Sequence, residues 1–525
     1  MSLMNTTEAL ASDCPLARFA RERPHEVALR LIPSDQRVTW RELEQRSRRC
    51  AAALQAAGLV PGDVVAIFLE NHVRYFELLW GAQRAGLYYV TISRHLKQEE
   101  MQYIVSDSGA RVVFCSAQTL AQVSVESLSN RGAICVSMDG PASGVMAYDA
   151  WVAGVAADVV LPDVPEGTDF CYSSGTTGVP KGIKRPLANA NRYFNATPSP
   201  RMQWKSFDVN TVFLSTAPFY HTAPVRWNMA VLGSGGTCIM MEKFEPQAAL
   251  VAIQTYGVTH AQWVPTMFVR LLRLPETVRL QYDVSSLCYA IHAAAPCPQH
   301  IKRQMIDWWG PVLYEFYSGT ELVGRTSLDS HEWLAHPGSV GRPEFGEVHI
   351  VDDAGTPLPT GQSGVIYFSG GGRFEYHNDP DKTRQAYDAR GWATYGDIGY
   401  LDDDGFLYLT DRVANTIVSG GVNIYPQEAE NRLLAHPAVH DVAVVGVPNV
   451  EFGEEVRAVV QLRDPAQASA DMAQALIAFC RDGMSHIKCP SGVDFVTELP
   501  RTDTGKLLKR LVKQRYWPDG VGIAK

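Results

Sequence analysis

One segment of the chain combines glycines, hydroxyl side chains and a lysine in a pattern that suits phosphate. Residues 172–182 read Tyr-Ser-Ser-Gly-Thr-Thr-Gly-Val-Pro-Lys-Gly and directly follow an expected strand. Glycine lets backbone N–H groups approach phosphate oxygens, hydroxyls donate further bonds or reach a magnesium ion, and Lys181 neutralises charge. The Walker A pattern fails, because Pro180 stands five residues after Gly175. We therefore expect a polyphosphate loop of another nucleotide-binding fold.

Further short motifs carry side chains that could complete such a site. Residues 317–321 read Tyr-Ser-Gly-Thr-Glu, and residues 395–399 read Tyr-Gly-Asp-Ile-Gly. A carboxylate beside a triphosphate is repulsive unless a divalent cation lies between them, so Glu321 suits a magnesium ligand. Taken alone, Glu321 would be a surface or helix-start carboxylate, and Asp397 would be a turn residue. Their common context favours a nucleotide site.

In order and residue types these motifs resemble the adenylate-forming (ANL) superfamily, which comprises acyl-CoA synthetases, nonribosomal-peptide adenylation domains and luciferases. The resemblance covers residues 15–515, includes residues 500–506 (Pro-Arg-Thr-Asp-Thr-Gly-Lys), and is to the acyl-CoA synthetase, or fatty-acid–CoA ligase, branch. It implies an acid–thiol ligase that converts ATP and a carboxylic acid to acyl-AMP and pyrophosphate, then passes the acyl group to coenzyme A with release of AMP. It also implies ATP and Mg²⁺ as cofactors and coenzyme A as co-substrate.

The resemblance also implies a role for each motif residue. Lys506 is the expected catalytic lysine of adenylation, while Thr177 and Glu321 are the expected magnesium ligands. The Tyr317 ring is expected to stack near adenine and Asp397 to accept bonds from the ribose hydroxyls. The remaining expected residues are His221 in catalysis, and in nucleotide or coenzyme binding Ser173, Ser174, Gly175, Thr176, Gly178, Lys181, Ala293, Ala294, Ala295, Ser318, Gly319, Thr320, Arg412, Gly420 and Gly421.

The sequence departs from its relatives in two places. Residues 293–295 are three alanines where relatives often carry a glycine-rich strand against adenine, which narrows the space there. Relatives rotate a small C-terminal domain between the two half-reactions and usually place Asp or Lys two residues after the motif arginine. Here that position is Ala414, followed by Asn415 where aspartate is common. An alanine can absorb the backbone change of a hinge, but the polar contacts that bias one conformer would differ.

Residues 217–224 bear on the acid that is activated. They resemble the family region between the nucleotide and acyl sites, with His221 at an aromatic or histidine gate. Amino-acid-activating relatives use an aspartate near residues 219–221 to pair the substrate ammonium, and none occurs here, so an uncharged acyl tail is favoured. We predict a medium- or long-chain fatty acyl group, with an aryl, bile-acid or steroid-side-chain acid as the alternative. Large side chains that could line an apolar pocket are Trp227, Met229, Gln262, Trp263 and Met267.

Other functions are compatible with the same fold. An acyl-AMP ligase could feed a carrier protein, or the adenylate could be oxidised as luciferases do. A nucleotide-binding regulator without catalysis is another alternative, but Thr177, Glu321, Asp397 and Lys506 are all present. A serine hydrolase is disfavoured because no GxSxG motif occurs, and a zinc site because Cys/His spacing is unsuitable.

The elements predicted from hydrophobic periodicity alternate between helices and buried strands. Helices are expected at 41–57, 75–85 and 98–106, and strands at 64–69 and 111–115, as parallel α/β sheets require. After residue 346 the strands become closely spaced, at 347–351, 364–368, 400–401 and 406–409. Beyond a boundary near 411–414 the pattern is mixed again, with helices at 426–434 and 471–481 and a strand at 441–447.

These patterns, together with the resemblance to the adenylate-forming superfamily, predict an α/β protein of two domains. The N-terminal AMP-binding domain, residues 1–411, would contain two α/β sheets and a small antiparallel β module at about 346–411. The C-terminal AMP-binding enzyme domain, residues 412–525, would be smaller, mobile and α+β, and would carry the catalytic lysine.

Composition excludes several classes of function. The formal net charge of −9 and the lack of long Lys/Arg blocks give no footprint for nucleic acid. One basic cluster, within residues 506–515, is either a solvated helix face or a neighbour of the nucleotide or coenzyme. Ten cysteines without CxxC pairs favour reduced thiols and a cytoplasmic location. We expect no transmembrane segment or signal peptide, small-molecule partners only, and a possible homodimer.

Overall fold

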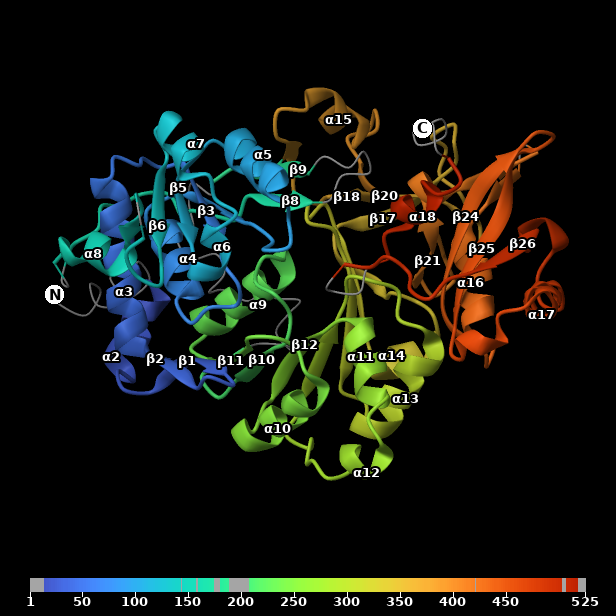
Figure 1. Cartoon of the computed structure of the whole chain (residues 1–525), viewed down its shortest axis with the longest axis horizontal. Helices are drawn as coiled ribbons and strands as arrows, with labels where there is room; N and C mark the ends of the chain where they lie inside the picture. The colour runs from blue at the N-terminus through green and yellow to red at the C-terminus, as the bar shows by residue number, and fades with distance from the viewer. Residues whose placement is uncertain are drawn as a thin grey trace, which may run out of the picture.

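The computed structural model describes residues 14–142, 144–156, 159–173, 180–187, 207–420, 422–502 and 507–517. It is a mixed α/β fold with a large N-terminal part built on several sheets and a smaller C-terminal α+β part (Figure 1). The predicted fold class is therefore confirmed. In Figure 1 the larger part runs from blue through green and yellow to light orange, and the smaller part is deep orange to red.

A five-stranded parallel sheet forms the first layer, in the order β4-β3-β5-β6-β7. All five residues of β3 are buried, as expected for a parallel strand covered on both faces. Thr39 and Glu42 form a capping box at the start of the long helix α3. The strands are β3 (Val64–Phe68), β4 (Tyr88–Thr91), β5 (Ala110–Cys115), β6 (Ile134–Ser137) and β7 (Met146–Ala147), and the helices are α3 (Trp40–Ala56), α4 (Tyr75–Arg84), α5 (Gln98–Ser108), α6 (Ala117–Leu120), α7 (Val125–Asn130) and α8 (Tyr148–Ala153).

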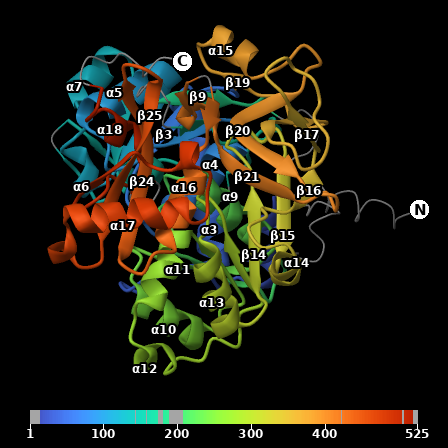
Figure 2. The same ribbon diagram turned by 90° about the vertical axis from the view of Figure 1, so that its right-hand side faces the viewer.

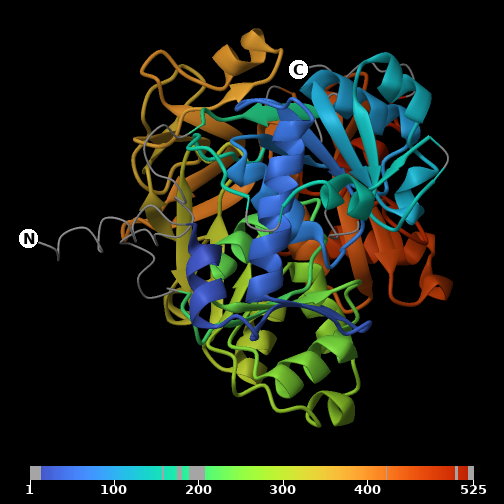
Figure 3. The same cartoon turned by 90° about the vertical axis from the view of Figure 1, so that its left-hand side faces the viewer.

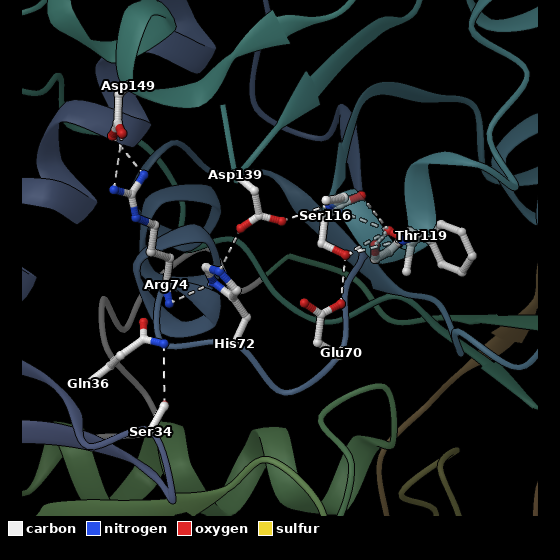
Figure 4. Close-up of polar contacts among 11 residues, drawn as sticks. Ser34, Gln36, Glu70, His72, Arg74, Ser116, Thr119, Asp139 and Asp149 are labelled. Atoms are coloured by element: carbon white, nitrogen blue, oxygen red, sulfur yellow. Dashed lines mark hydrogen bonds and ion pairs between the residues drawn. The ribbon is translucent and has the colours of Figure 1, made fainter. Parts of the chain in front are cut away.

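A polar network joins the carboxyl ends of three strands of this sheet (Figure 4). Ser116 Oγ donates to Glu70 Oε2 at 2.7 Å, and the backbone N–H of Ala117 donates to Asp139 Oδ2 at 2.7 Å. His72 Nε2 lies 3.5 Å from Asp139 Oδ1. Because these groups satisfy one another, the network is a structural tie between the segments that follow β3, β5 and β6.

A nine-stranded sheet forms the second layer, in the order β16-β15-β14-β13-β12-β10-β11-β1-β2. The β1–β2 hairpin comes from the N-terminus yet pairs with β11 (Figure 3). β15 and β16 are antiparallel, so the parallel α/β alternation ends before residue 346, after which the sequence predicted closely spaced strands. Its strands are β1 (Val27–Ile32), β2 (Gln36–Thr39), β10 (Val212–Ser215), β11 (Thr237–Met241), β12 (His260–Trp263), β13 (Tyr289–His292), β14 (Leu313–Tyr317), β15 (Arg325–Asp329) and β16 (Arg342–Phe345).

Two apolar clusters cover the two faces of the nine-stranded sheet. Phe213 and Met240 belong to one cluster, and their chain neighbours Leu214 and Met241 belong to the other. This alternation is the period of two expected of strands. The helices associated with this sheet are α2 (Pro15–Glu22), α9 (Thr222–Gly233), α10 (Pro246–Tyr256), α11 (Pro265–Leu272), α12 (Glu276–Arg279), α13 (Gln299–Trp309) and α14 (Ser330–Ala335).

Two small antiparallel sheets lie between the larger layers and the C-terminal part. One has the order β17-β18-β20-β21, and the other has the order β19-β9-β8. The sequence indicated strands at 400–401 and 406–409, but β20 begins at residue 393 and β21 extends to residue 412. The elements are β8 (Cys171–Ser173), β9 (Lys181–Lys184), β17 (Glu347–Val351), β18 (Gly364–Ser369), β19 (Glu375–Tyr376), α15 (Pro380–Gln385), β20 (Ala393–Leu401) and β21 (Leu407–Arg412).

The C-terminal part faces the viewer in Figure 2 and has a hydrophobic core of its own. That core contains Ile417, Leu433, Val444, Ala458 and Leu476. Its elements are three 3-10 segments (Val413–Asn415, Pro465–Gln467 and His486–Lys488), the strands β22 (Ile417–Ser419), β23 (Val422–Ile424), β24 (Val439–Asn449), β25 (Gly453–Leu462) and β26 (Gly492–Phe495), and the helices α16 (Pro426–Leu434), α17 (Ala470–Arg481) and α18 (Lys509–Lys513).

Candidate functional site

The predicted site residues gather where strands from three sheets end close together. Tyr317 is the last residue of β14, and residues 318–320 follow it directly. Residues 293–295 follow the neighbouring parallel strand β13. Ligands of open α/β sheets bind at the carboxyl ends of such strands. The nine-stranded sheet thus presents two of the predicted motifs at one edge.

Part of the predicted phosphate loop lies outside the described residues, but its two flanks are described. β8 enters the loop and β9 leaves it, and Ser173 and Lys181 are cross-strand partners. The loop between them is therefore closed by an antiparallel pair. The predicted residues outside the described part of the chain are Ser174, Gly175, Thr176, Thr177, Gly178, Gly421 and Lys506.

Tyr317, Asp397 and Arg412 come from three separate motifs and meet in one contact. The Tyr317 hydroxyl donates to Asp397 Oδ2 at 2.6 Å, and Arg412 Nε lies 2.8 Å from Asp397 Oδ1. Burial and Asp397 together raise the pKa of Tyr317 well above its usual value, so it remains a donor. Asp397 is buried, and each of its oxygens still has lone-pair capacity for a further donor. The arrangement suits a carboxylate that accepts bonds from paired hydroxyls.

Glu321 is held by a residue that the sequence did not single out. The Tyr376 hydroxyl donates to Glu321 Oε1 at 2.9 Å, and Lys181 Nζ lies 5.7 Å from the centre of the Tyr376 ring. Burial, followed by the nearby Lys382, lowers the pKa of Lys181 to about 8. A Cβ at Gly319 would collide with the ring of Tyr395 and would lie 2.7 Å from Glu321 Oε2, so only glycine fits at that position.

The donors present fit a magnesium ion held largely by substrate phosphates. Within the described residues, no group of three or more His, Cys, Asp or Glu could hold a metal by itself. Glu321 nevertheless keeps Oε2 without a hydrogen bond from any described residue. Magnesium typically takes one or two carboxylates and completes its shell with water and phosphate oxygens. A single free carboxylate oxygen is what that mode requires.

The adenine and acyl sides of the site show two further features. Ala294 has a φ of 77°, in the left-handed region that glycine adopts without strain. His221 precedes the first residue of α9, and its ring centre lies 4.5 Å from that of Tyr220. Away from these two sides, Gly420, which is expected in nucleotide or coenzyme binding, has a φ of 56° and donates its N–H to the Phe452 carbonyl.

The five large side chains proposed for an apolar pocket do not form one wall. Trp227 and Met229 belong to one core cluster, whereas Trp263 and Met267 belong to the cluster on the opposite sheet face. Trp263 is fully buried against Phe244, Phe268 and Trp309. These residues serve mainly as core.

A buried charge cluster beside β8 escaped the sequence analysis. Asp169 Oδ1 lies 2.6 Å from Arg185 Nη2, and Asp169 Oδ2 lies 2.7 Å from Arg226 Nη2. Burial acts to raise the pKa of Asp169, but Arg226 and Arg185 outweigh it and hold the pKa well below its usual range. Asp169 is therefore ionised throughout the physiological pH range.

The join between the two parts of the chain is a short 3-10 segment after Arg412. Asn415 Nδ2 donates to Asp411 Oδ1 at 3.0 Å, and the Gln427 backbone N–H donates to Asp411 Oδ2 at 2.8 Å. Ala414 is exposed and contributes no side-chain bond.

The described helices include none that is long and apolar enough to span a membrane.

Comparison with known proteins gives a consistent family. The description "AMP-binding enzyme" matches residues 16–375, and "AMP-binding enzyme C-terminal domain" matches residues 428–506. A feruloyl-CoA synthase from an Amycolatopsis species is 33% identical over 95% of this chain and 98% of its own length. The long-chain-fatty-acid–CoA ligase FadD13 of Mycobacterium tuberculosis is 31% identical over 92% of this chain and 94% of its own.

Among solved structures, MatB from Rhodopseudomonas palustris is similar in two states. At 26% identity, each alignment covers 96% of this chain and 98% of MatB. The TM-score is 0.83 with the ATP-bound form and 0.73 with the apo form.

Proposed function

The chain belongs to the AMP-binding enzyme family of adenylate-forming acyl-CoA and acid ligases, and on that premise we propose a two-step reaction for it. In the first step a carboxylic acid and ATP form an acyl-adenylate and pyrophosphate. In the second step the acyl group passes to the thiol of coenzyme A and AMP leaves. The overall activity is that of an AMP-forming acid–thiol ligase.

The observation that carries the proposal is the contact among Tyr317, Asp397 and Arg412. In our proposal Asp397 accepts bonds from both ribose hydroxyls, while Tyr317 and Arg412 fix its orientation. A carboxylate oriented beforehand binds without paying the entropy of ordering at the moment of binding. The Tyr317 ring would lie beside adenine, with residues 293–295 on the other side.

Charge at the phosphates would be handled by Lys181 and Glu321. Lys181 follows the phosphate loop as the first residue of β9 and supplies positive charge there. We assign Glu321 and Thr177 as the magnesium ligands; a magnesium ion bound there would neutralise phosphate charge as pyrophosphate leaves. The roles that we propose for Thr177 and the other phosphate-loop hydroxyls come from the sequence.

Lys506 is the proposed catalytic lysine of the first step. Attack of the carboxylate on the α-phosphate builds negative charge, and a lysine bridging both groups would stabilise it. The greater similarity to ATP-bound than to apo MatB, at equal identity and coverage, supports a domain arrangement suited to this step. We propose residues 1–411 and 412–525 as the two moving domains.

For the acid, we propose a medium- or long-chain fatty acid. The likeness to FadD13 supports this choice, as does the uncharged character of residues 219–221. An aryl acid is the second candidate, because a feruloyl-CoA synthase is 33% identical over nearly the whole of both chains. We also infer a cytoplasmic location, since all ten cysteines are free thiols.

The test is release of pyrophosphate from ATP with a panel of acids, short to long and aliphatic to polycyclic, with and without coenzyme A. Turnover that needs both an acid and coenzyme A is the expected result and names the substrate class. Turnover indifferent to coenzyme A would point to a carrier-protein acceptor. ATP binding with no release for any acid would instead indicate a regulator and refute the proposed function.

A further inference from the structure

In the cluster of Asp169, Arg185 and Arg226, both oxygens of the single carboxylate make ion pairs. Each oxygen of Asp169 holds one guanidinium, and the Cys171 thiol also donates to Oδ2 at 2.8 Å. Asp169 lies two residues before β8 and Arg185 directly follows β9. The pair Asp169–Arg185 thus ties together the two strands that flank the phosphate loop.

The cluster carries an uncompensated positive charge. Two guanidinium groups share one carboxylate, and among the described residues Asp169 is the only carboxylate within ion-pair distance of Arg185 or Arg226. The chain segments on either side of β9 that lie outside the described residues, 174–179 and 188–206, contain no Asp or Glu. Because two guanidinium groups share the charge of one carboxylate in a partly desolvated cluster, the cluster favours the arrival of an anion.

The spare charge of the cluster is directed at the reaction site through Arg226. Its Nη2 lies 3.4 Å from the Thr320 carbonyl oxygen, one residue before Glu321. Its Nε is buried and has no hydrogen-bond partner among the described residues. The Arg226 side chain nevertheless keeps 25% of its surface accessible. Arg185, by contrast, directs its Nη2 to Asp169 and to the Thr168 hydroxyl.

The position of Arg226 favours the acid, rather than the nucleotide phosphates, as the anion that Arg226 binds. Arg226 lies on α9, five residues after His221 at the predicted acyl gate. The phosphate side already has Lys181 with Lys382 beside it. A guanidinium offers several donors in one plane and matches a carboxylate better than a point charge does.

Resting on the function proposed above, we propose that Arg226 forms an anion subsite that binds a carboxylate oxygen of the acid, with Asp169 as its positioning residue. Two sources share this chemistry. One is the carboxylate that is activated, and the other is a second carboxylate at the far end of a dicarboxylic acid. In either case the bound carboxylate would neutralise the cluster and hold the acid against the Thr320 segment.

The experiment measures binding without turnover. Octanoate, octanedioate and AMP are each titrated calorimetrically into the wild type, Arg226→Gln and Arg226→Lys, the two acids also in the presence of AMP. We expect Arg226→Gln to raise the Kd of octanedioate about ten-fold or more, with AMP changed less than about two-fold. Arg226→Lys keeps the charge and should lose less. An equal loss for octanoate would assign the activated carboxylate, and an unchanged octanoate would assign the second one.

Arg185→Gln is the matched control, because it removes the other ion pair of Asp169 but not the contact with Thr320. It should cost similar thermal stability while leaving acid binding within about three-fold. The subsite is refuted if Arg226→Gln leaves the Kd of both acids unchanged, or weakens AMP as much as the acids. Because no turnover is needed, a wild type that activates no acid would sink the proposed function without deciding this test.

Discussion

Tyr376 contacts both charged side chains, Glu321 and Lys181, that lie on the proposed phosphate side of the site. Its hydroxyl holds Glu321 and its ring faces the Lys181 ammonium. The sequence could not indicate this, because Tyr376 is 55 residues from Glu321 and 195 from Lys181, and no local pattern links them. Tyr317, Asp397 and Arg412 were selected from motifs, and the structure brings them into contact. Arg226 and Asp169 were missed for the same reason as Tyr376.

Replacing Tyr376 by phenylalanine should weaken the metal side of the site. Loss of a hydrogen bond to a carboxylate costs about 1.5–3 kcal/mol when the pair is partly buried. We therefore expect Tyr376→Phe to raise the Mg²⁺ concentration for half-maximal pyrophosphate release about ten-fold, and to weaken Mn²⁺ binding to the ATP complex in spin-resonance titrations.

The matched control is Tyr387→Phe. The Tyr387 hydroxyl bonds only the backbone of Phe374 among the described residues, and its ring stacks on Phe374. It should cost stability but leave metal affinity unchanged. Equal effects of the two variants on Mn²⁺ binding would show that Tyr376 does not orient Glu321.

Substitutions at Ala294 can test the backbone strain on the adenine side of the site. A left-handed φ costs an alanine roughly 1–2 kcal/mol, and glycine at the same place loses about 0.4–1 kcal/mol through the unfolded state. Ala294→Gly should therefore stabilise the protein by about 0.5–1 kcal/mol in urea unfolding. Ala293→Gly, where φ is not left-handed, should destabilise it. If both variants destabilise equally, the strain at Ala294 is absent.

At the scale of elements, hydrophobic periodicity predicted the helices and strands whose formation depends mainly on local sequence. The buried run of β3, the capping-box helix α3 and helix α16 were all predicted within a residue or two. The three-stranded sheet β19-β9-β8 was missed, because its strands have two to four residues and one lies about 190 residues from its partner. Pairing at that distance depends on tertiary packing rather than local propensity.

Strand β12 contains a histidine that should make stability depend on pH. Burial lowers the pKa of His260 to about 4, with Asp208 acting weakly in the opposite direction. The His260 ring stacks on Tyr289 at 5.1 Å, and its Nδ1 lies 2.8 Å from Thr259 Oγ1. Below the unfolded-state pKa of about 6.5 the unfolded chain takes up a proton that the folded one does not. Stability is then lost as the pH falls from about 6.5 towards 4.

The measurement is urea unfolding of the wild type and His260→Gln at several pH values. The loss approaches about 1.4 kcal/mol per pH unit below the unfolded-state pKa, so the wild type should lose about 1.5 kcal/mol more than the variant between pH 6.5 and 5. Above pH 7 the two curves should run parallel, because neither state carries the proton. Parallel curves below pH 6 as well would mean that His260 is protonated in the folded protein.

At the scale of the whole molecule, the polar contacts between the described residues of the two parts include one at the surface. Arg273 Nη2 lies 3.0 Å from the His440 ring, and the contact joins an exposed arginine to a half-buried histidine. Such solvent-exposed contacts contribute little free energy. Each part has its own apolar core, so relative motion about the join requires no core to be disrupted. The sequence predicts a boundary near residues 411–414, whereas contacts such as Arg273–His440 depend on the assembled fold.

Ala414 is where that motion can be tested. It lies in the 3-10 segment Val413–Asn415, and 3-10 helices have φ of about −50 to −70°. Proline fixes φ near −65°, so it is compatible with this segment and would oppose any other conformation. Ala414→Pro should therefore hold the present arrangement. Since that arrangement is the one proposed for adenylation, we expect pyrophosphate release in a single turnover to stay within about three-fold, while transfer of supplied acyl-AMP to coenzyme A slows about ten-fold or more. Ala414→Gly keeps the hinge free and should retain both rates. Slowing of pyrophosphate release alone would reverse the assignment of the two arrangements, and unchanged kinetics in both variants would locate the rotation away from residues 412–415.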